Sequence, residues 1–444
     1  MKKYIFVFLC TLCYTSTFSQ VKTEYWNSKN QVSGKENKKS EGTFKDSLKD
    51  GKWTYWYENG NKLSEGEYIL NNKTGHWTYW YSNGNKWSDL FYENGVDTSW
   101  YENGQKEKQG LIKNGKMQGE WITWHENGEI KEKTIYINGL KEGKSVSFYS
   151  DKQKEFDGSY VNDSLHGYAF WWYSNGNKEM QGKSINGLQD SIWSFYYTNG
   201  QIGSKGNFLK GKLDSIWTYW YETGEKWKQG LFVQGIKEGV WTTWYESGMK
   251  EHEGAFLKGK ETGEWINWYK NGQERTKGTF KEGLMEGLWT GWYENGVKRY
   301  EIYYANNIRN GSAKYWYENS NLMYTGFYKN DEMHGAWTQW YETGLTQEAG
   351  SYIDGKKNGS WVFYDGYGVI AKEQQFAIGK PNGKWATYYA NGKKSAEGTN
   401  INGYKEGKWI YWNDKGEVIY SVSYKKGVKK SEFPKPKTTE TKKK

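Results

Sequence analysis

A short aromatic pattern recurs through this chain at a fixed spacing, and that spacing limits the possible folds more than any other feature. The first clear copy is residues 51–60, GKWTYWYENG. Counted by its first tryptophan position, the pattern occurs at 53, 77 and 97, and then thirteen times in 24-residue steps from 121 to 409, giving sixteen units. Such a period predicts a stack of similar units in which each unit contacts its neighbours.

The tryptophans indicate the phase of the repeat. Of the 28 in the chain, twelve lie at the counting position and twelve lie three residues later. Aromatic residues make up 19% of the chain, whereas hydrophobic residues as a whole make up only 35%. This composition predicts a thin structure in which large rings pack on their neighbours, rather than one large aliphatic core.

Each unit has the pattern of a β-hairpin. Residues 52–58 favour a strand, and Asn59-Gly60 is typical of a two-residue type I′ turn, in which both residues have positive φ. We expect residues 63–69 to form the return strand and a looser turn ending near Gly75 to lead to the next unit. No helical period is sustained. We therefore predict an all-β fold: an elongated repeat array of stacked antiparallel β-hairpins, built as a twisted single sheet or an open solenoid.

The predicted turn fixes the register of the hairpin. It places three pairs of residues opposite each other: Glu58 and Asn61, Tyr57 and Lys62, and Trp53 and Gly66. A glycine accompanies the tryptophan in most units. An indole can lie over the bare backbone of a cross-strand glycine and offset the cost of that glycine in a sheet. We expect Trp53 to cover Gly66 in this way.

Alternation along a strand divides the aromatic residues between two faces. Trp53, Tyr55 and Tyr57 share one face, which we interpret as the core, whereas Thr54 and Trp56 lie on the other. A partly exposed row of Trp56 and its equivalents would offer a surface to a sugar or a partner chain, since exposed apolar rows usually mark interaction sites. The candidate binding residues are Trp56, Trp80, Trp220, Trp244, Trp268, Trp292, Trp316 and Trp340.

The chain divides into four segments. Residues 1–19 have the positive start, short apolar stretch and small-x-small end of a secretory signal peptide, and we expect cleavage before Gln20. Residues 20–41 are expected to be an N-terminal cap or linker, and residues 42–424 the repeat array. Residues 425–444 are expected to be a disordered, lysine-rich tail. The predicted location is periplasmic, outer-surface or secreted.

Cysteine and charge narrow the possible functions. Cys10 and Cys13 lie within the expected signal peptide, so the mature chain would have no thiol for a disulfide, a metal or nucleophilic catalysis. Residues 425–444 contain nine lysines and two glutamates. The array is therefore close to neutral and lacks the basic stripe that nucleic-acid binding needs. We expect the tail to be solubilising, with at most weak contact with an anionic surface. No later stretch is long and apolar enough to span a bilayer.

Some units are weakened. Ser145 and Phe148 replace both tryptophans of one unit, and Ala169 replaces the first tryptophan of the next. In a third unit Ala313 replaces the first tryptophan, and Asn319-Ser320 stands at the turn. These units are predicted sites of bending or local opening.

No group of residues has the pattern of a catalytic or metal site. The five histidines, at 76, 125, 166, 252 and 334, occupy different phases of the repeat, except for two that lie seven units apart. A glutamate precedes the turn in eight units, at 58, 102, 126, 222, 246, 294, 318 and 342. Paired carboxylates can perform glycosidase chemistry, but identical repeated positions provide no differentiated acid and base. We predict a non-enzymatic protein that needs no metal and no cofactor.

The full pattern, Gly-x-Trp-x-x-Trp-Tyr-Glu-Asn-Gly followed by Gly-x-Phe/Tyr and Gly-Lys-x-x-Gly, resembles the MORN repeat in its bacterial variant form. Residues 253–265, EGAFLKGKETGEW, are a good example. The resemblance covers residues 42 to 424. It implies stacked antiparallel hairpins that act mostly as protein- or lipid-interaction scaffolds.

These features lead to one main expectation and one alternative. The main expectation is an exported, non-enzymatic repeat scaffold that mediates protein–protein interaction in the bacterial cell envelope, with an envelope protein as its partner. The alternative is a carbohydrate, cell-wall or lipid binding module that uses a ladder of exposed tryptophan and tyrosine side chains.

Overall fold

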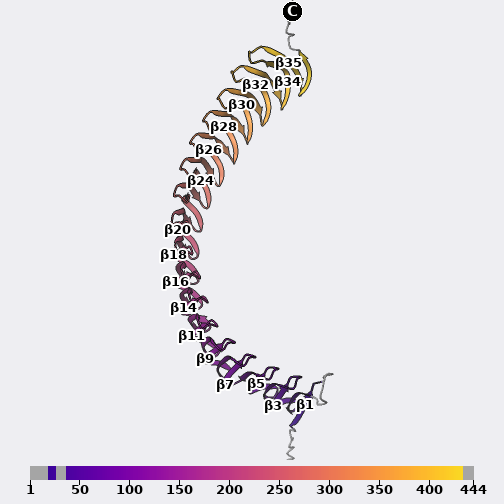
Figure 1. Cartoon of the computed structure of the whole chain (residues 1–444), viewed down its shortest axis with the longest axis vertical. Helices are drawn as coiled ribbons and strands as arrows, with labels where there is room; N and C mark the ends of the chain where they lie inside the picture. Colours follow the sequence, from indigo (N-terminus) through magenta and orange to yellow (C-terminus); the bar gives the residue numbers. More distant parts are fainter. Residues whose placement is uncertain (1–18, 27–36, 434–444) are drawn as a thin grey trace, which may run out of the picture. The chain divides into compact units, whose positions relative to one another are not determined.

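A computed structural model describes residues 19–26 and 37–433 of the chain. These residues form 36 β-strands and no helix, so the prediction of an all-β fold is confirmed. The chain divides into two compact parts, an N-terminal half (residues 1–212) and a C-terminal half (residues 213–444) (Figure 1). Nothing in the described part of the chain forms an apolar helix of membrane-spanning length. The predicted signal peptide, residues 1–19, lies almost wholly outside the described residues.

The strands of the N-terminal half are β1 (Gln20–Tyr25), β2 (Lys38–Lys45), β3 (Leu48–Trp56), β4 (Lys62–Ile69), β5 (Asn72–Trp80), β6 (Lys86–Phe91), β7 (Asn94–Trp100), β8 (Lys106–Lys113), β9 (Lys116–Trp124), β10 (Ile130–Ile137), β11 (Leu140–Phe148), β12 (Lys154–Val161), β13 (Ser164–Leu165), β14 (Gly167–Trp172), β15 (Lys178–Ile185), β16 (Leu188–Tyr196) and β17 (Ile202–Leu209).

The C-terminal half begins within β18 (Lys212–Trp220). Its other strands are β19 (Lys226–Val233), β20 (Ile236–Trp244), β21 (Lys250–Leu257), β22 (Lys260–Trp268), β23 (Glu274–Lys281), β24 (Leu284–Trp292), β25 (Lys298–Ala305), β26 (Ile308–Trp316), β27 (Leu322–Lys329), β28 (Glu332–Trp340), β29 (Thr346–Ile353), β30 (Lys356–Tyr364), β31 (Ile370–Ala377), β32 (Lys380–Tyr388), β33 (Lys394–Ile401), β34 (Tyr404–Trp412), β35 (Val418–Lys425) and β36 (Val428–Phe433).

Within each half the strands form an open antiparallel sheet in which neighbours along the chain are neighbours in the sheet. β3 pairs with β4 and β4 with β5, for example, and β27 pairs with β28 and β28 with β29. A sheet built only from such local pairings lengthens by one strand at a time. This is the serial hairpin array that the period predicts.

The outer turn of each hairpin differs from the prediction. In the first hairpin the N–H of Gly60 donates to the Tyr57 carbonyl at 3.0 Å, and the N–H of Tyr57 donates to the Asn61 carbonyl at 2.8 Å. Gly60 has a φ of 87°, whereas the preceding asparagine is not in the left-handed region. The loop is thus a three-residue turn that ends in a left-handed glycine. The predicted type I′ turn is wrong, as are the partners predicted for Glu58 and Tyr57.

A bulge in the return strand restores the register. Leu63 is an extra residue there, because the register shifts beside Trp56. The shift offsets the one-residue difference between the two kinds of turn. Trp53 therefore pairs with Gly66, as predicted. The same shift recurs in other hairpins.

The type I′ turn lies at the opposite end, between one hairpin and the next. Leu70 and Asn71 both have positive φ, 48° and 69°, between the paired residues Ile69 and Asn72. A left-handed glycine then follows inside β5: Gly75 has a φ of 61°. At this point residues 75–77 lie opposite a single residue of β4, so β5 bulges.

Most counting-position tryptophans cover a glycine of the preceding hairpin, not of their own. A Cβ on Gly66 would lie 2.2 Å from the ring of Trp77, and a Cβ on Gly42 would lie equally close to the ring of Trp53. The indole N–H of Trp77 donates to the carbonyl of Glu67 at 3.0 Å. The expected cover of Gly66 by Trp53 is therefore wrong, although those two residues are paired. The bulge at the start of β5 positions the next indole over that glycine instead.

The covered face carries a ladder of aromatic rings. Phe44 meets Trp53 edge-on at 5.0 Å between ring centroids, and Tyr68 meets Trp77 in the same way at 5.0 Å. Trp53 is only 3% exposed, which confirms that its face forms the core, whereas Tyr55 is half-buried. The ladder continues through the C-terminal half, where Phe280 and Trp289 repeat the contact.

In two of the three weak units, a second substitution fills the space left by the missing indole. Where Ser145 replaces tryptophan, Thr134 stands at the glycine position, and their hydroxyls hydrogen-bond at 2.6 Å. Where Ala313 replaces tryptophan, Ile302 stands at the glycine position, and both are buried. The unit of Ala169 is less regular, since its strand is split into β13 and β14.

Strands extend past both predicted boundaries of the repeat array, residues 42 and 424. β1 pairs with β2, and the indole N–H of Trp26 donates to the Trp56 carbonyl at 3.1 Å, so structure begins before residue 42. At the other end, residues 428–433 form β36 and pair with β35. The expected disorder from residue 425 is therefore wrong for these residues. The rest of the predicted tail, residues 434–444, lies outside the described part.

Candidate binding surface

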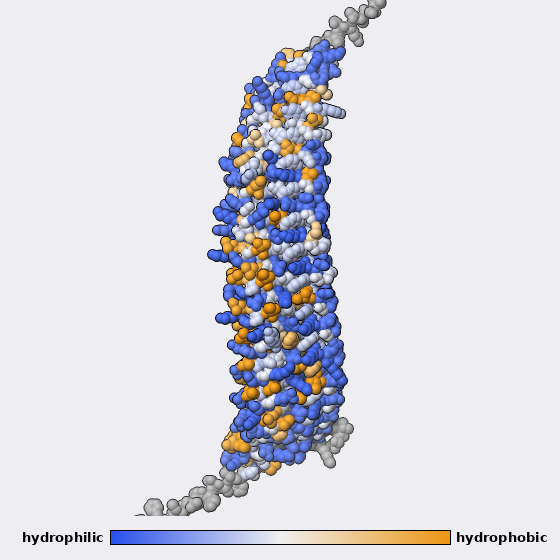
Figure 2. Space-filling model, turned by 90° about the vertical axis from the view of Figure 1, so that its left-hand side faces the viewer, coloured by the Kyte–Doolittle hydropathy of each residue, from blue (hydrophilic) through white to orange (hydrophobic). Residues whose placement is uncertain are grey.

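The predicted binding row lies on the face opposite the core. Its members are half-buried rather than openly exposed: Trp56, Trp80, Trp220, Trp244, Trp268, Trp292, Trp316 and Trp340. Each ends a long strand immediately before the outer turn, so equivalent rings recur once in each hairpin that carries one. Figure 2 shows one face of the molecule, on which apolar residues form small groups among hydrophilic ones. Whether the row binds a ligand stays a prediction.

Lysines from the preceding hairpin lie over several of these rings. The Nζ of Lys62 is 5.4 Å from the ring centroid of Trp80, and the Nζ of Lys250 is 5.5 Å from that of Trp268. Lys38 and Lys226 take the same position over Trp56 and Trp244. The charged face is therefore partly built from cation–aromatic contacts, which leave less ring surface for a ligand than an open row would.

Carboxylates beside these lysines complete the charged face. Lys62 Nζ lies 2.9 Å from Glu65, and Lys52 Nζ lies 3.1 Å from the same side chain. Burial opposes ionisation of Glu65, but the hydrogen bonds from the two lysines outweigh it and lower its pKa. This pattern repeats at Asp157, between Lys154 and Lys144. Opposite charges thus alternate on this face, as expected for a nearly neutral array.

A second ladder joins successive hairpins through tyrosine hydroxyls. The hydroxyl of Tyr57 donates to the carbonyl of Trp80 at 2.9 Å, and the hydroxyl of Tyr269 donates to that of Trp292 at 2.9 Å. The turn asparagines form a parallel link, since Asn59 Nδ2 donates to the Ser82 carbonyl at 2.7 Å. Most residues of the repeated Trp-Tyr-Glu-Asn-Gly sequence therefore have a structural role between neighbouring units.

In the described part of the chain, the histidines and the glutamates before the turns do not form a separate metal site. His125 replaces a ladder tyrosine, with Nε2 2.9 Å from the Phe148 carbonyl, and His76 stacks on Phe91 at 4.4 Å. The eight glutamates before the turns are exposed. Among residues 19–26 and 37–433, no group of three or more His, Cys, Asp or Glu side chains is arranged to hold a metal ion.

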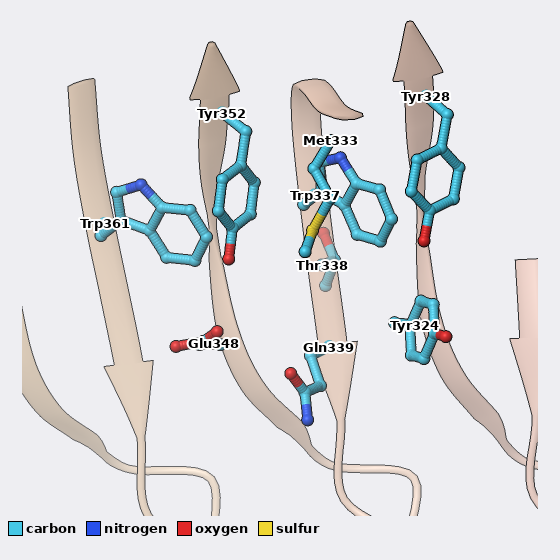
Figure 3. A pocket seen from close by; sticks show the side chains of 9 residues that line it. All are labelled: Tyr324, Tyr328, Met333, Trp337, Thr338, Gln339, Glu348, Tyr352 and Trp361. Carbon is cyan, nitrogen blue, oxygen red and sulfur yellow. The ribbon is translucent and has the colours of Figure 1, made fainter. Parts of the chain in front are cut away.

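A hollow that the sequence reasoning did not identify lies on the core face of the C-terminal half. It is a cleft of about 260 Å³ that crosses β27, β28, β29 and β30. In Figure 3, the rings of Tyr328, Trp337, Tyr352 and Trp361 stand side by side, one from each strand. Tyr324, Gln339 and Glu348 lie below these rings in the view, on β27, β28 and β29, so polar and aromatic groups meet in the cleft.

Strand pairing explains this convergence. Gln339 of β28 pairs with Tyr324 on one side and with Glu348 on the other, so the three side chains form one row across the sheet. Glu348 Oε2 accepts from Lys357 Nζ at 2.7 Å. Burial raises the pKa of Tyr324 and of Tyr352, so both phenols are neutral at physiological pH. The cleft thus presents neutral hydroxyls, an amide and one ion-paired carboxylate.

These features define a class of protein: an all-β scaffold of serial hairpins held together by aromatic ladders. The sequence profile described as the MORN repeat variant matches five segments, residues 49–69, 73–94, 117–138, 285–306 and 309–330. The chain thus contains MORN-type repeats, and these five matches cover less than half of it. No curated protein matches the chain.

Solved structures give only weak matches. The crystal structure of TcdB2-TccC3 is 10% identical with a TM-score of 0.15, and the match covers 91% of this chain and 24% of that chain. A structure of the Photorhabdus luminescens Tc holotoxin pore is 10% identical with a TM-score of 0.15, covering 90% of this chain and 23% of that one. The chain spans about a quarter of the length of these structures. Likenesses at this TM-score carry no argument about fold or function.

Proposed function

We propose that this chain is an exported, non-enzymatic scaffold of the bacterial cell envelope that binds another protein along its repeat array. We also infer that the array comprises all sixteen 24-residue units, beyond the five that the family profile matches. The contact of tryptophan with the preceding glycine supports this count. It recurs outside the matched segments, for example between Trp193 and Gly182 and between Trp409 and Gly398.

The observation that carries the proposal is the repetition of the same contacts in successive hairpins. The tyrosine-to-carbonyl bond, the asparagine link and the covered glycine all join one unit to the next. Repeat arrays of this kind provide extended surfaces for binding, because their length grows without a change in the unit. Export rests on residues 1–19, whose pattern is that of a signal peptide.

Affinity capture tests the proposal. The mature chain from residue 20, immobilised through an added C-terminal tag, is incubated with detergent extracts of the envelope. One protein that is recovered reproducibly, and that is displaced by excess untagged chain, is the expected result. Recovery of no reproducible protein from envelope extracts would contradict the proposal. N-terminal sequencing of the chain from the envelope fraction checks export, with Gln20 as the expected first residue.

A second candidate, carbohydrate binding, rests on one stretch of the tryptophan row. Among the described residues, no cationic side chain lies over the half-buried rings of Trp292, Trp316 and Trp340, which occupy successive hairpins. Such rings offer a flat apolar surface of the kind on which sugars stack. Titration of wall polymers with tryptophan fluorescence as the readout tests this candidate. A spectrum that stays unchanged at millimolar ligand would eliminate it.

A further inference from the structure

Several units of this chain hold a lysine ammonium over the core tryptophan. In β5 the Nζ of Lys73 is 4.3 Å from the ring of Trp77 and 2.8 Å from the hydroxyl of Tyr79. The lysine stands four residues before the tryptophan and the tyrosine two residues after it. β3 and β34 repeat the arrangement: the ammonium-to-ring distances are 4.4 and 4.2 Å, and the ammonium-to-hydroxyl distances are 2.7 and 3.2 Å.

β28 keeps the tryptophan of this cluster but exchanges both of its partners. Met333 stands where the lysine would be, and Gln339 stands where the tyrosine would be, on either side of Trp337. Methionine brings no charge, and glutamine is shorter than tyrosine. The cleft of about 260 Å³ lies at this position and is lined by all three residues (Figure 3).

Other units without this lysine fill the position with another side chain. In the unit of Trp121, the Nζ of Lys108 lies 5.6 Å from the indole. In the unit of Trp265, His252 stacks on the indole at 6.2 Å. In β24 the ring of Tyr300 covers Gly291, where a Cβ would lie 2.3 Å from it. In β28 the ring of Tyr324 lies 5.7 Å from that of Trp337, a comparable distance, and the cleft lies beside the two rings.

The groups around the cleft suit a hydrogen-bond donor that carries positive charge. Glu348 uses Oε2 for Lys357, and its Oε1 has no hydrogen-bond partner among residues 37–433. The amide oxygen of Gln339 and the hydroxyls of Tyr328 and Tyr352 are further acceptors. An ammonium over the indole face would gain the same attraction that the chain uses in its own clusters.

The cationic side chains on either side of the cleft show how closely successive cations are spaced along the array. Arg309 lies 4.1 Å from the ring of Tyr328, and Lys357 lies 3.8 Å from the ring of Trp361. They stand one repeat before and one repeat after Met333. Lys49 and Lys73, which stand one repeat apart, occupy successive clusters of the N-terminal half in the same way. A cation in the cleft would therefore complete a row at the spacing that the protein already tolerates.

We propose that the cleft across β27–β30 binds the ammonium end of a lysine side chain from the partner protein, in the place where other units hold their own lysine. This inference rests on the proposed function of protein binding and names one chemical element of the partner.

The test uses the mature full-length chain and two probes that differ only in the ammonium group, Nα-acetyl-lysine amide and Nα-acetyl-norleucine amide. Binding is followed by calorimetry and by tryptophan fluorescence. The lysine probe is expected to bind at least about fivefold more tightly, as an ammonium over an indole in a partly desolvated site implies. Equal binding of the two probes would overturn the proposal, as would binding of a neutral disaccharide but not of the lysine probe.

Two variants locate the site. Met333→Lys supplies the internal ammonium and is expected to abolish binding of the lysine probe. Met285→Lys changes the equivalent position of β24, where Tyr300 covers the space, and is expected to leave binding unchanged. Glu348→Gln is expected to weaken binding without abolishing it. Binding that survives Met333→Lys would contradict the assignment.

The partner experiment separates this inference from the proposed function. If the partner is captured equally well by the wild type and by Met333→Lys, the lysine site is wrong and the scaffold function stands. If the lysine probe binds but no envelope protein is captured, the site stands and the proposed function fails.

Discussion

The indole of Trp77 lies across the backbone of Gly66, the glycine eleven residues before it, and donates its N–H to the next carbonyl of that strand. This contact joins two hairpins rather than the two strands of one hairpin. It makes each unit depend on the unit before it, which is the cooperativity expected of a repeat array.

Gly66→Ala is expected to destabilise the array locally. The added Cβ would lie 2.2 Å from the Trp77 ring, and Trp77 is 0% exposed, so the ring has no free space to enter. Overpacking of this kind costs about 1–3 kcal/mol. Hydrogen exchange of β4 and β5 measures the loss, because a long array does not unfold as one two-state unit. Gly366→Ala is the control, since a Cβ there would contact nothing within 4 Å; equal protection in the two variants would contradict the account.

Ala313→Trp tests the same contact from the other side. Ile302 occupies the glycine position, so the new indole would collide with it, and we expect a loss of about 1–3 kcal/mol. Adding Ile302→Gly should recover most of the lost stability. A double-mutant cycle measures the coupling between the two positions. Additive effects would show that the exchange of residues in this unit is not compensatory.

Tyr269→Phe removes one rung of the tyrosine ladder. Its hydroxyl donates to the Trp292 carbonyl at 2.9 Å, and the loss of such a bond costs about 0.5–1.5 kcal/mol. Faster hydrogen exchange at the ends of β22 and β24 is the expected result. Tyr367→Phe provides the matched control, because that side chain is 90% exposed at a turn. If the two variants exchange hydrogen at the same rate, the tyrosine ladder does not contribute to stability.

Stability should fall at alkaline pH through the core tyrosines. Burial, with the hydrogen bond that Tyr68 shares with Tyr55, raises the pKa of Tyr68 to about 12 from an ordinary value of 10.0. A raised pKa favours the neutral form in the folded state. The contribution is therefore fully present below pH 10 and is lost as pH rises to about 12. Urea denaturation across this range should show a shallower pH dependence for Tyr68→Phe than for the wild type, and identical profiles would contradict the assignment.

The periodicity made the architecture predictable. The local backbone geometry could not be predicted from it. The spacing of Trp53 and its equivalents predicts the hairpins, and the pairing of Trp53 with Gly66 is correct. The turn type was wrong because Asn59 does not take a left-handed conformation: its side chain instead links to the next turn. The tryptophan–glycine contact was assigned to the wrong hairpin, since the bulge after Gly75 has no sequence signature independent of the fold.

The candidate site was harder to predict than the fold. The row of Trp56 could be located by alternation alone, but the lysines above it were not foreseen. The cleft at Trp337 is visible only when units are compared at positions other than the tryptophans. Met333 and Gln339 then stand out against the lysine and tyrosine of β5, and the signal is an exchange of two residues rather than a motif.

Crosslinking in the native envelope tests most directly the central claim, that the array binds a partner protein at the cleft across β27–β30. A photoreactive group is placed on the core face at position 333, and another is placed at the exposed turn position 367 as a control. The account predicts that one envelope protein is crosslinked reproducibly from position 333 and not from position 367. Recovery of no protein from position 333, or of the same proteins from both positions, would contradict it.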